Sequence, residues 1–350
     1  MNFESKSAAL VRTATFSDEA RWNGYVDQNP DACVYHRFAW GEIFHRVYGV
    51  KSYPLLAERD GRAAGVLPLV ELTRGPFRSQ IVSLPYFAHG GAIADDEAAY
   101  RALLTAATRI ARERGAQHVE LRHAHAVPGS LPARDDKVLM VMDLPDTLAA
   151  LEKQVGSKVR ADVRRPQKEG MSTEVGGREL VADFHATYAA VMRDLGSPCH
   201  SAALFDETAR RFDDRSFVVR VLYQGRTVGA AFLIGQGDTL EVPCAGTLHA
   251  LNKLRPNMLL YWAIFRAAIE RGYKRFSFGR STVDAGTYTF KKNWGASPIA
   301  LRYEYILPDG VELPRSHGED PLLAKVSQTW MQLPVPLTTA IGPLLVRHLA

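Results

Sequence analysis

The stretch from Gly279 to Gly295, which reads GRSTVDAGTYTFKKNWG, gathers side chains with chemical potential. It contains a guanidinium, hydroxyls, a carboxylate and a group of aromatic and cationic side chains: Arg280, Ser281, Thr282, Asp284, Tyr288, Phe290, Lys291, Lys292 and Trp294. A lysine fixed beside an aromatic ring presents a positive charge where an oxyanion or a phosphate forms. We therefore select Phe290 and Lys291 as the catalytic pair. From composition alone, a solvated connection with one ring beneath it explains the stretch equally well.

Residues 157–170, SKVRADVRRPQKEG, form a second candidate, a basic helix. Its cations recur every four positions and so lie on one face: Arg160, Arg164 and Lys168, flanked by Lys158 and Arg165. Like charges at this spacing repel one another, so an anionic partner would relieve the repulsion. We expect Ser157 to cap the helix and Pro166 to kink it or begin a new one. The alternative is an ordinary solvated helix face.

His200 lies in the stretch LGSPCHSAAL, directly after Cys199. Neighbouring residues rarely point toward one another as a nucleophile and its base must. We therefore expect His200 to line a substrate-binding loop.

The turn before a predicted helix over residues 257–271 is a candidate cofactor site, because the start of a helix attracts a pyrophosphate. Arg255 and Asn257 are the cofactor-binding candidates. A CoA enzyme would be expected to carry glycines in this turn, and it has none. The first half of the chain has a Gly-Gly pair at 90–91, but three carboxylates follow and repel a phosphate. Both turns therefore argue against the usual mode of CoA binding.

The elements that must position these residues follow the same succession in both halves of the chain: a hairpin, a helix and a returning strand. The hairpins span residues 53–71 and 217–234 and turn at Asp60-Gly61 and Gln224-Gly225. The helices span residues 98–114, capped by Asp95, and 257–271. Similar motifs recur at matching places: GRAAG at 61–65 with GRTVG at 225–229, and RERG at 112–115 with IERG at 269–272. We infer a duplicated domain.

A strand over residues 10–16, a helix over 17–27 capped by Ser17 and a helix over 38–47 precede the first hairpin. Adjacent strands followed by a helix and a strand indicate a mixed sheet with helices packed on it. We predict an α+β fold of two such domains, each a mixed, mostly antiparallel sheet flanked by helices. The predicted bounds are 1–145 for the first domain, 146–310 for the second and 311–350 for a tail.

The composition is that of an ordinary globular protein, with 350 residues, 46% hydrophobic and 23% charged. A net charge of +5 suits an anionic partner, and we expect no DNA partner. Three separate cysteines without a CxxC pair argue against a disulfide framework or a zinc site. The first residues lack the apolar core of a signal peptide, and no apolar run of about 18 residues occurs. We expect a cytoplasmic protein without a metal.

Several segments resemble a known family. GTYTFKKNWGA at 286–296 is similar to the FKxxFG-type motif of the FemAB aminoacyltransferases, and SKVRADVRRPQKEGM resembles the helix that opens their second domain. RDLGSPCHS at 193–201 and the tail WMQLPVPLTTAIGPLLVRHL at 330–349 resemble the FemAB-like proteins of exosortase/PEP-CTERM systems in exopolysaccharide-producing bacteria. The likeness covers nearly the whole chain. It implies two GNAT-type domains, in agreement with the duplication.

The resemblance implies transfer of an acyl or aminoacyl group to an amine of a cell-envelope or exopolysaccharide precursor. No permanent cofactor is implied, because acyl-CoA or aminoacyl-tRNA serves as co-substrate. Phe290 and Lys291 match the pair at the transfer centre. Arg160, Arg164 and Arg165 match only as members of the basic helix. Trp294 stands where the family often has Phe, and the chain lacks the coiled-coil arm that assists tRNA handling in some members.

Acyl transfer needs a deprotonated amine, an aligned carbonyl and a group that stabilises the tetrahedral intermediate. We assign the last role to Lys291. Arg280, Asp284 and Tyr288 are candidates for orienting the acceptor, with Ser281, Trp294 and His200 as further substrate-binding candidates. Asp284 and His249 are the candidate bases, with bulk water as the alternative.

The main interpretation is a transferase whose donor is either acyl-CoA or aminoacyl-tRNA. Two other interpretations remain open. The duplicated fold could be a non-catalytic module that binds an anionic glycan or a lipid-linked precursor, or a CoA-dependent acetyltransferase with an unusual cofactor loop. The tail, broken by prolines, could rest on the inner membrane or pack on the body of the protein.

Overall fold

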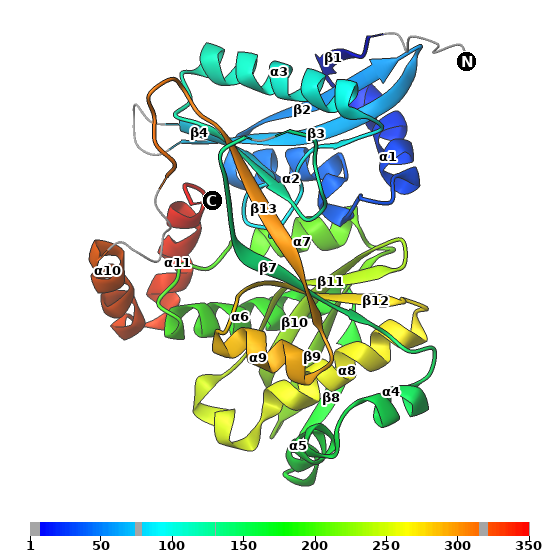
Figure 1. Ribbon diagram of the computed structural model, residues 1–350. Helices are drawn as coiled ribbons and strands as arrows, with labels where there is room; N and C mark the ends of the chain where they lie inside the picture. The colour runs from blue at the N-terminus through cyan, green and yellow to red at the C-terminus, as the bar shows by residue number, and fades with distance from the viewer. Residues whose placement is uncertain (1–7, 74–78, 130, 315–320, 350) are drawn as a thin grey trace. The chain divides into compact units, whose positions relative to one another are not determined.

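The computed structural model describes residues 8–73, 79–129, 131–314 and 321–349 (Figure 1). The chain divides into two compact units. The first comprises Met1–Lys137, Ala300–Pro314 and Arg347–Ala350, and the second comprises Val138–Ile299 and Arg315–Val346. The domain bounds predicted from the sequence stay a prediction, and residues 315–320 and 350 of the predicted tail lie outside the described part.

The first unit is built on a mixed sheet. Its strands are β1 (Leu10–Thr13), β2 (Lys51–Arg59), β3 (Arg62–Thr73), β4 (Ser79–Ser83), β5 (Ile93–Ala94), β6 (Val119–His123) and most of β13 (Ser297–Ile306). The order is β1-β2-β3-β4-β6-β13, with β4 and β6 parallel and the other neighbours antiparallel. The helices are η1 (Phe16–Asp18), α1 (Glu19–Gln28), η2 (Val34–His36), α2 (Ala39–Tyr48) and α3 (Glu97–Arg114). The buried residues of α3 form one core with those of the strands.

The β2–β3 hairpin shows why the sequence predicts this part well. Asp60 and Gly61 have φ of 50° and 76°, the left-handed pair that a tight type I′ turn requires. The hairpin of β9 (Ser216–Tyr223) and β10 (Arg226–Gln236) in the second unit turns in the same way, with φ of 51° at Gln224 and 74° at Gly225. Both predicted turns are confirmed.

Three predicted helix starts are wrong. Thr15 forms a capping box with Asp18, so Ser17 lies inside η1 rather than capping the helix. The α3 cap is Asp96, whose carboxylate accepts from the Ala99 N–H at 3.0 Å; Asp95 accepts instead from the Tyr25 hydroxyl at 2.9 Å. Gly156 caps the basic helix, in place of Ser157, and the helix continues through Pro166.

The second unit repeats the plan of the first. Its strands are β7 (Ala133–Asp143) from Val138 onward, β8 (Ser172–Gly176), β9 (Ser216–Tyr223), β10 (Arg226–Gln236), β11 (Thr239–Thr247) and β12 (Arg275–Thr282), in the order β7-β12-β11-β10-β9-β8. Its helices are α4 (Leu148–Gln154), α5 (Ser157–Lys168), η3 (Arg178–Leu180), α6 (Val181–Asp194), α7 (Ala202–Arg211), η4 (His249–Leu254), α8 (Pro256–Glu270), α9 (Gly286–Asn293), α10 (Pro321–Gln332) and α11 (Val335–Val346).

Both faces of this sheet are covered by helices (Figure 1). Phe217 and Val219 of β9 share a core with α5 and α8, whereas Val218 between them packs with α6 and α7. This alternation is the period of two that a strand buried on both faces imposes. The strands are therefore fixed between two helical layers.

Strands β11 and β12 form the parallel pair of the second unit. They pair from Thr239 with Arg275 to Glu241 with Ser277. The register of β11 against β10 then shifts at a bulge between Phe232 and Ile234, and β11 runs on to Thr247. The ladder between β11 and β12 therefore ends at Glu241 and Ser277, although β12 continues to Thr282.

The tail forms helices α10 and α11, which contact α6. A side chain added at Gly342 of α11 would lie 3.0 Å from backbone atoms of Cys199, so glycine permits this close approach. Among the described helices, none combines the length and the apolar composition that crossing a membrane requires.

Candidate functional site

A cavity of about 530 Å³ lies in the second unit where α8 begins. Its lining residues come from α5, the end of β11, η4 and the start of α8: Arg165, Thr247, Asn252, Lys253, Arg255 and Asn257. Three of the six carry a positive charge and the other three are neutral and polar. The start of a helix adds the positive end of its dipole. The cavity is therefore suited to a phosphate or another anion.

Arg255 is the residue that shapes this cavity. It caps α8 in the left-handed conformation, with φ of 59°, and Pro256 follows as the first helical residue. A glycine would adopt this conformation without strain, and strained residues are characteristic of functional sites. Nη1 of Arg255 donates to the Asp162 carboxylate of α5 at 2.5 Å, which holds the side chain between the two helices. The absence of glycine in this turn therefore does not prevent an anion site.

Lys291 and Phe290, the predicted catalytic pair, do not line the cavity. Lys291 is 8% exposed, and its Nζ donates to the carbonyl oxygens of Gly279 at 3.2 Å and Arg280 at 2.9 Å. Burial and the charge of Arg280 lower the pKa of Lys291 to about 8. The Phe290 ring packs edge-on against Tyr261, with ring centroids 5.2 Å apart. Lys291 thus joins α9 to the end of β12, whereas Phe290 packs α9 against α8.

The rest of the predicted stretch divides between strand and helix. Arg280, Ser281 and Thr282 belong to β12, which is longer than the sequence suggests. Ser281 and Trp294 are buried, and within the described residues Oγ of Ser281 and Nε1 of Trp294 have no hydrogen-bond partner. The other polar members are exposed or half-buried: Arg280, Asp284 and Tyr288, whose ring lies 5.6 Å from the Lys292 ammonium.

The arginines of the basic helix have different surroundings. Nη1 of Arg160 donates to the carbonyl oxygens of Glu152 at 2.8 Å and Val155 at 2.6 Å, so it closes the end of α4. Arg164 is exposed on α5. Arg165 alone lines the cavity.

His200 lies in the loop between α6 and α7. Its carbonyl oxygen is 2.9 Å from Nε2 of His185, and burial lowers the pKa of His200 to about 4. The ring is therefore neutral at pH 7. His200 and His249, one of the predicted bases, are not among the residues that line the cavity.

Sequence reasoning missed four residues. Thr247, Asn252 and Lys253 line the cavity, and Glu241 is a buried carboxylate, 4% exposed, at the last position where β11 pairs with β12. A signal was available for two of them. Lys253 stands two residues before Arg255 at a helix start, and Glu241 interrupts an apolar strand.

Comparison with protein families gives a match over part of the chain. Residues 157–292 match the family described as "Acetyltransferase (GNAT) domain". These residues run from α5 to α9 and include every residue of the cavity. A comparison with curated proteins gave no match.

Solved structures share the fold at low sequence identity. A crystal structure of FemX is 15% identical with a TM-score of 0.64, and the likeness covers 84% of this chain and 96% of FemX. The C-terminal domain of a protein from Agrobacterium fabrum, named as a lysylphosphatidylglycerol synthetase, is 13% identical with a TM-score of 0.55, covering 82% and 91%. A tandem GNAT protein from the clavulanic acid biosynthesis pathway is 12% identical with a TM-score of 0.51, covering 87% and 100%.

These findings confirm the predicted fold class. Residues 157–292 match the GNAT acetyltransferase family, and the chain has a tandem GNAT-like fold of mixed sheets flanked by helices.

Proposed function

We propose that the protein takes an acyl group from acyl-CoA and transfers it to an amine of a cell-envelope or exopolysaccharide precursor. The observation that carries this proposal is the cavity at the start of α8, whose walls bring Arg165, Lys253 and Arg255 together. A CoA ester carries its negative charge in phosphate groups, and cations at a helix start bind phosphate. The match to an acetyltransferase domain over residues 157–292 supports the same donor.

In this proposal the phosphates lie in the cavity and the acyl arm extends along β11. Beyond Glu241 this strand no longer pairs with β12, so its backbone edge on that side can pair with an extended ligand as an added strand would. Such pairing holds the acyl carbonyl in one orientation. The carbonyl carbon then stays open to an attacking amine.

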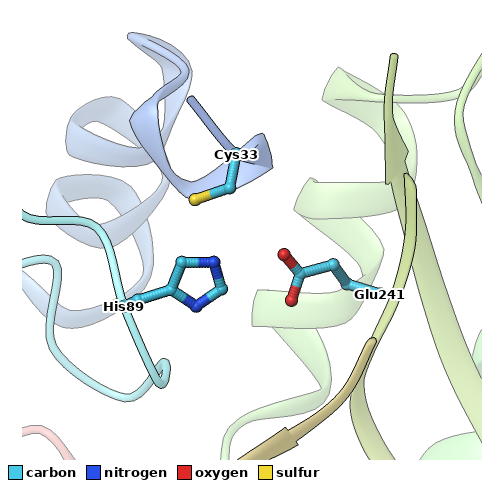
Figure 2. Close-up of side chains that lie close together, drawn as sticks. All are labelled: Cys33, His89 and Glu241. Carbon is cyan, nitrogen blue, oxygen red and sulfur yellow. The ribbon is translucent and has the colours of Figure 1, made fainter. Parts of the chain in front are cut away.

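Glu241 is our candidate for the base that removes the proton from the amine. Its carboxylate is buried, and Glu241 stands at the last position where β11 pairs with β12; Figure 2 shows its side chain. A positioned carboxylate of this kind accelerates proton transfer by about 10²–10⁴-fold. Asp284 and His249 are both exposed, so we assign them no proton transfer. Arg280, Asp284 and Tyr288 keep the proposed role of orienting the acceptor.

We propose that Lys291 acts by position rather than by contact with the reacting atoms. Its ammonium already binds two carbonyl oxygens at the end of β12. Loss of these bonds would release the strand end that carries Arg280.

The proposed acceptor rests on similarity. The sequence resembles FemAB-like proteins, and the fold is similar to that of a protein whose name describes joining a lysyl group to phosphatidylglycerol. An aminoacyl-tRNA donor is the alternative to acyl-CoA. The exposed cations Lys158, Arg164 and Lys168 on α5 would suit it.

We propose in addition that α11 rests on an anionic membrane surface. Thr338, Gly342 and Val346 are its buried face. The outer face is apolar too, because Leu337 and Leu344 are 45% and 57% exposed and lie one above the other at helical spacing. From Pro321 to Ala350 the sequence contains no Asp or Glu, whereas Lys325 and Arg347 are cationic. An apolar face flanked by positive charge is typical of helices that lie on anionic lipid.

Thermal unfolding with different donors tests the proposed function. Acetyl-CoA at about a hundred times its dissociation constant should stabilise the protein by about 2.7 kcal/mol, whereas S-acetylpantetheine, which lacks the diphosphate, should not. Stabilisation by aminoacyl-tRNA alone would identify the other donor. If neither donor stabilises the protein, the proposal fails and a non-catalytic glycan-binding module takes its place.

A further inference from the structure

The first unit contains a thiol and imidazole cluster that the proposed transfer does not use. Cys33 lies just before η2, and its Sγ is 3.3 Å from Nδ1 of His36. The backbone N–H of Cys33 donates to the same nitrogen at 3.0 Å. Nε2 of His36 lies 2.9 Å from the carbonyl oxygen of Gly91. Because a carbonyl only accepts, Nε2 carries the ring proton, and Nδ1 is left as the acceptor beside the thiol.

A second imidazole lies next to the same sulfur. Figure 2 shows the Cys33 thiol beside the ring of His89, and a ring nitrogen of His89 lies within 4.8 Å of Sγ. The His89 ring is held edge-on against Tyr35, with centroids 5.4 Å apart. Cys33 is half-buried, whereas His36 is 1% exposed, so the base is fixed and the thiol is the more accessible group.

The surroundings separate Cys33 from the other two cysteines. Burial by itself raises the pKa of the Cys33 thiol, but His89 and His36 outweigh it and bring the pKa to about 6. Burial raises the pKa of Cys199, and it raises the pKa of Cys244 to about 12. The thiolate is the nucleophilic form of cysteine. At neutral pH, Cys33 is therefore the cysteine that can attack an electrophile.

The position of the cluster in the duplicated fold supports a function. His89 and Gly91 belong to the connection between β4 and α3. The matching connection of the second unit, between β11 and α8, supplies Lys253 and Arg255 to the cationic cavity. The β4–α3 connection contains no Lys or Arg. The same place in the fold thus contributes to the thiol and imidazole cluster in one unit and to the cationic cavity in the other.

We propose that Cys33 is a nucleophilic thiol that accepts acyl groups from thioesters, with His36 as the base. The choice of a thioester rests on the proposed function. Nδ1 of His36 takes the thiol proton, and Sγ attacks the carbonyl carbon of the thioester. A new carbon–sulfur bond forms while the donor's carbon–sulfur bond breaks, and the departing thiolate recovers the proton from the imidazolium. The products are S-acyl-Cys33 and the free donor thiol.

Alkylation of the whole protein tests the nucleophile without any acyl donor. Iodoacetamide labelling of each cysteine, followed by peptide mass spectrometry over a range of pH, should give a midpoint of about 6 for Cys33. Cys199 and Cys244 are internal controls that should label only at alkaline pH. The variant His36→Gln should raise the Cys33 midpoint by about one pH unit or more. A Cys33 midpoint of about 8.5, the value of an ordinary thiol, would overturn the proposal.

Exposure to acetyl-CoA tests the acyl step. Acid-quenched protein should carry one hydroxylamine-labile acetyl group on Cys33, and Cys33→Ser should carry none. His36→Gln should slow acetylation at about pH 7 and recover at about pH 9, where the thiolate forms without a base. If His36→Gln does not fold, His89→Gln provides the second test. It leaves the base in place but should raise the pKa of Cys33, and so it should also slow acetylation at about pH 7. If no adduct forms in a protein that still acetylates an amine, acyl transfer to Cys33 is refuted, whereas the proposed function is not. If iodoacetamide labels Cys33 with a midpoint of about pH 6 but acetyl-CoA gives no adduct, the acyl step is also refuted.

Discussion

The ammonium group of Lys291 in α9 donates a hydrogen bond to the carbonyl oxygen of Arg280 in β12 at 2.9 Å, and a second one to Gly279 at 3.2 Å. A lysine in so polar a sequence would ordinarily lie in solvent. Here it is buried and joins a helix to the strand that carries Arg280. Lys291 therefore contributes to the arrangement of the segment that we propose to hold the acceptor.

Replacement of Lys291 by Met should destabilise the protein, because two buried carbonyl oxygens lose their donor. We expect a loss of about 1–3 kcal/mol in the free energy of unfolding, measured by urea denaturation. Lys292→Met is the matched control, since Lys292 is exposed, and it should leave stability unchanged. A Lys291→Met protein with normal stability but no transfer would instead place this ammonium at the reacting atoms.

Acid should destabilise the first unit through His123. This side chain is fully buried, and burial together with His125 lowers its pKa well below the ordinary value. The folded protein keeps the ring neutral while the unfolded chain takes up a proton at about pH 6.5. The free energy of unfolding should therefore fall as the pH drops below about 6.5, by up to about 1.4 kcal/mol per pH unit.

The variant His123→Gln should reduce this pH dependence by that amount, as measured by urea unfolding between about pH 7.5 and about pH 5.5. His45→Gln, at an exposed position of α2, is the control and should keep the slope of the parent protein. An unchanged slope in His123→Gln would show that the acid sensitivity arises elsewhere.

Membrane binding by α11 should depend on its outer leucines. Leu344→Glu should weaken binding to vesicles that contain phosphatidylglycerol by about tenfold or more, because it removes apolar area and adds a negative charge. Co-sedimentation measures the bound fraction, and vesicles of phosphatidylcholine alone should bind little. Leu10→Glu changes an exposed leucine of β1 and should have no effect. Equal binding by both variants would contradict a membrane role for α11.

Removal of the proposed base should separate chemistry from binding. Glu241→Gln should still bind acetyl-CoA but should transfer acetyl groups to glucosamine, used as an amine probe, about 10²-fold more slowly. The defect should shrink at high pH, where more of the amine is already deprotonated. A variant with normal turnover would remove Glu241 from the mechanism.

Features fixed by local backbone chemistry were predictable from the sequence. The turns at Asp60-Gly61 and Gln224-Gly225 follow from residues that tolerate positive φ, and their repetition revealed the duplication. The cap of α3 was misplaced by one residue because two adjacent aspartates offer the same chemistry. Only tertiary contacts, such as that of Asp95 with Tyr25, decide which aspartate caps the helix.

The site was harder to predict because distant residues build it. The sequence offered no glycine before α8, yet Arg255 adopts the left-handed conformation and bonds to Asp162 of α5. Composition likewise placed Lys291 in solvent or at a reacting centre, whereas the packing of α9 against β12 buries it. Both outcomes depend on which helix meets which strand, and residue types alone do not determine that.

The affinity for acetyl-CoA, measured by isothermal titration calorimetry, tests the central claim most directly. Arg255→Ala removes a cation from the cavity and should weaken binding by about tenfold or more, a cost of about 1.4 kcal/mol or greater. Arg266→Ala removes an arginine of the same helix that does not line the cavity, and its affinity should equal that of the parent protein. Equal affinity in all three proteins would contradict the assignment of this cavity to the donor.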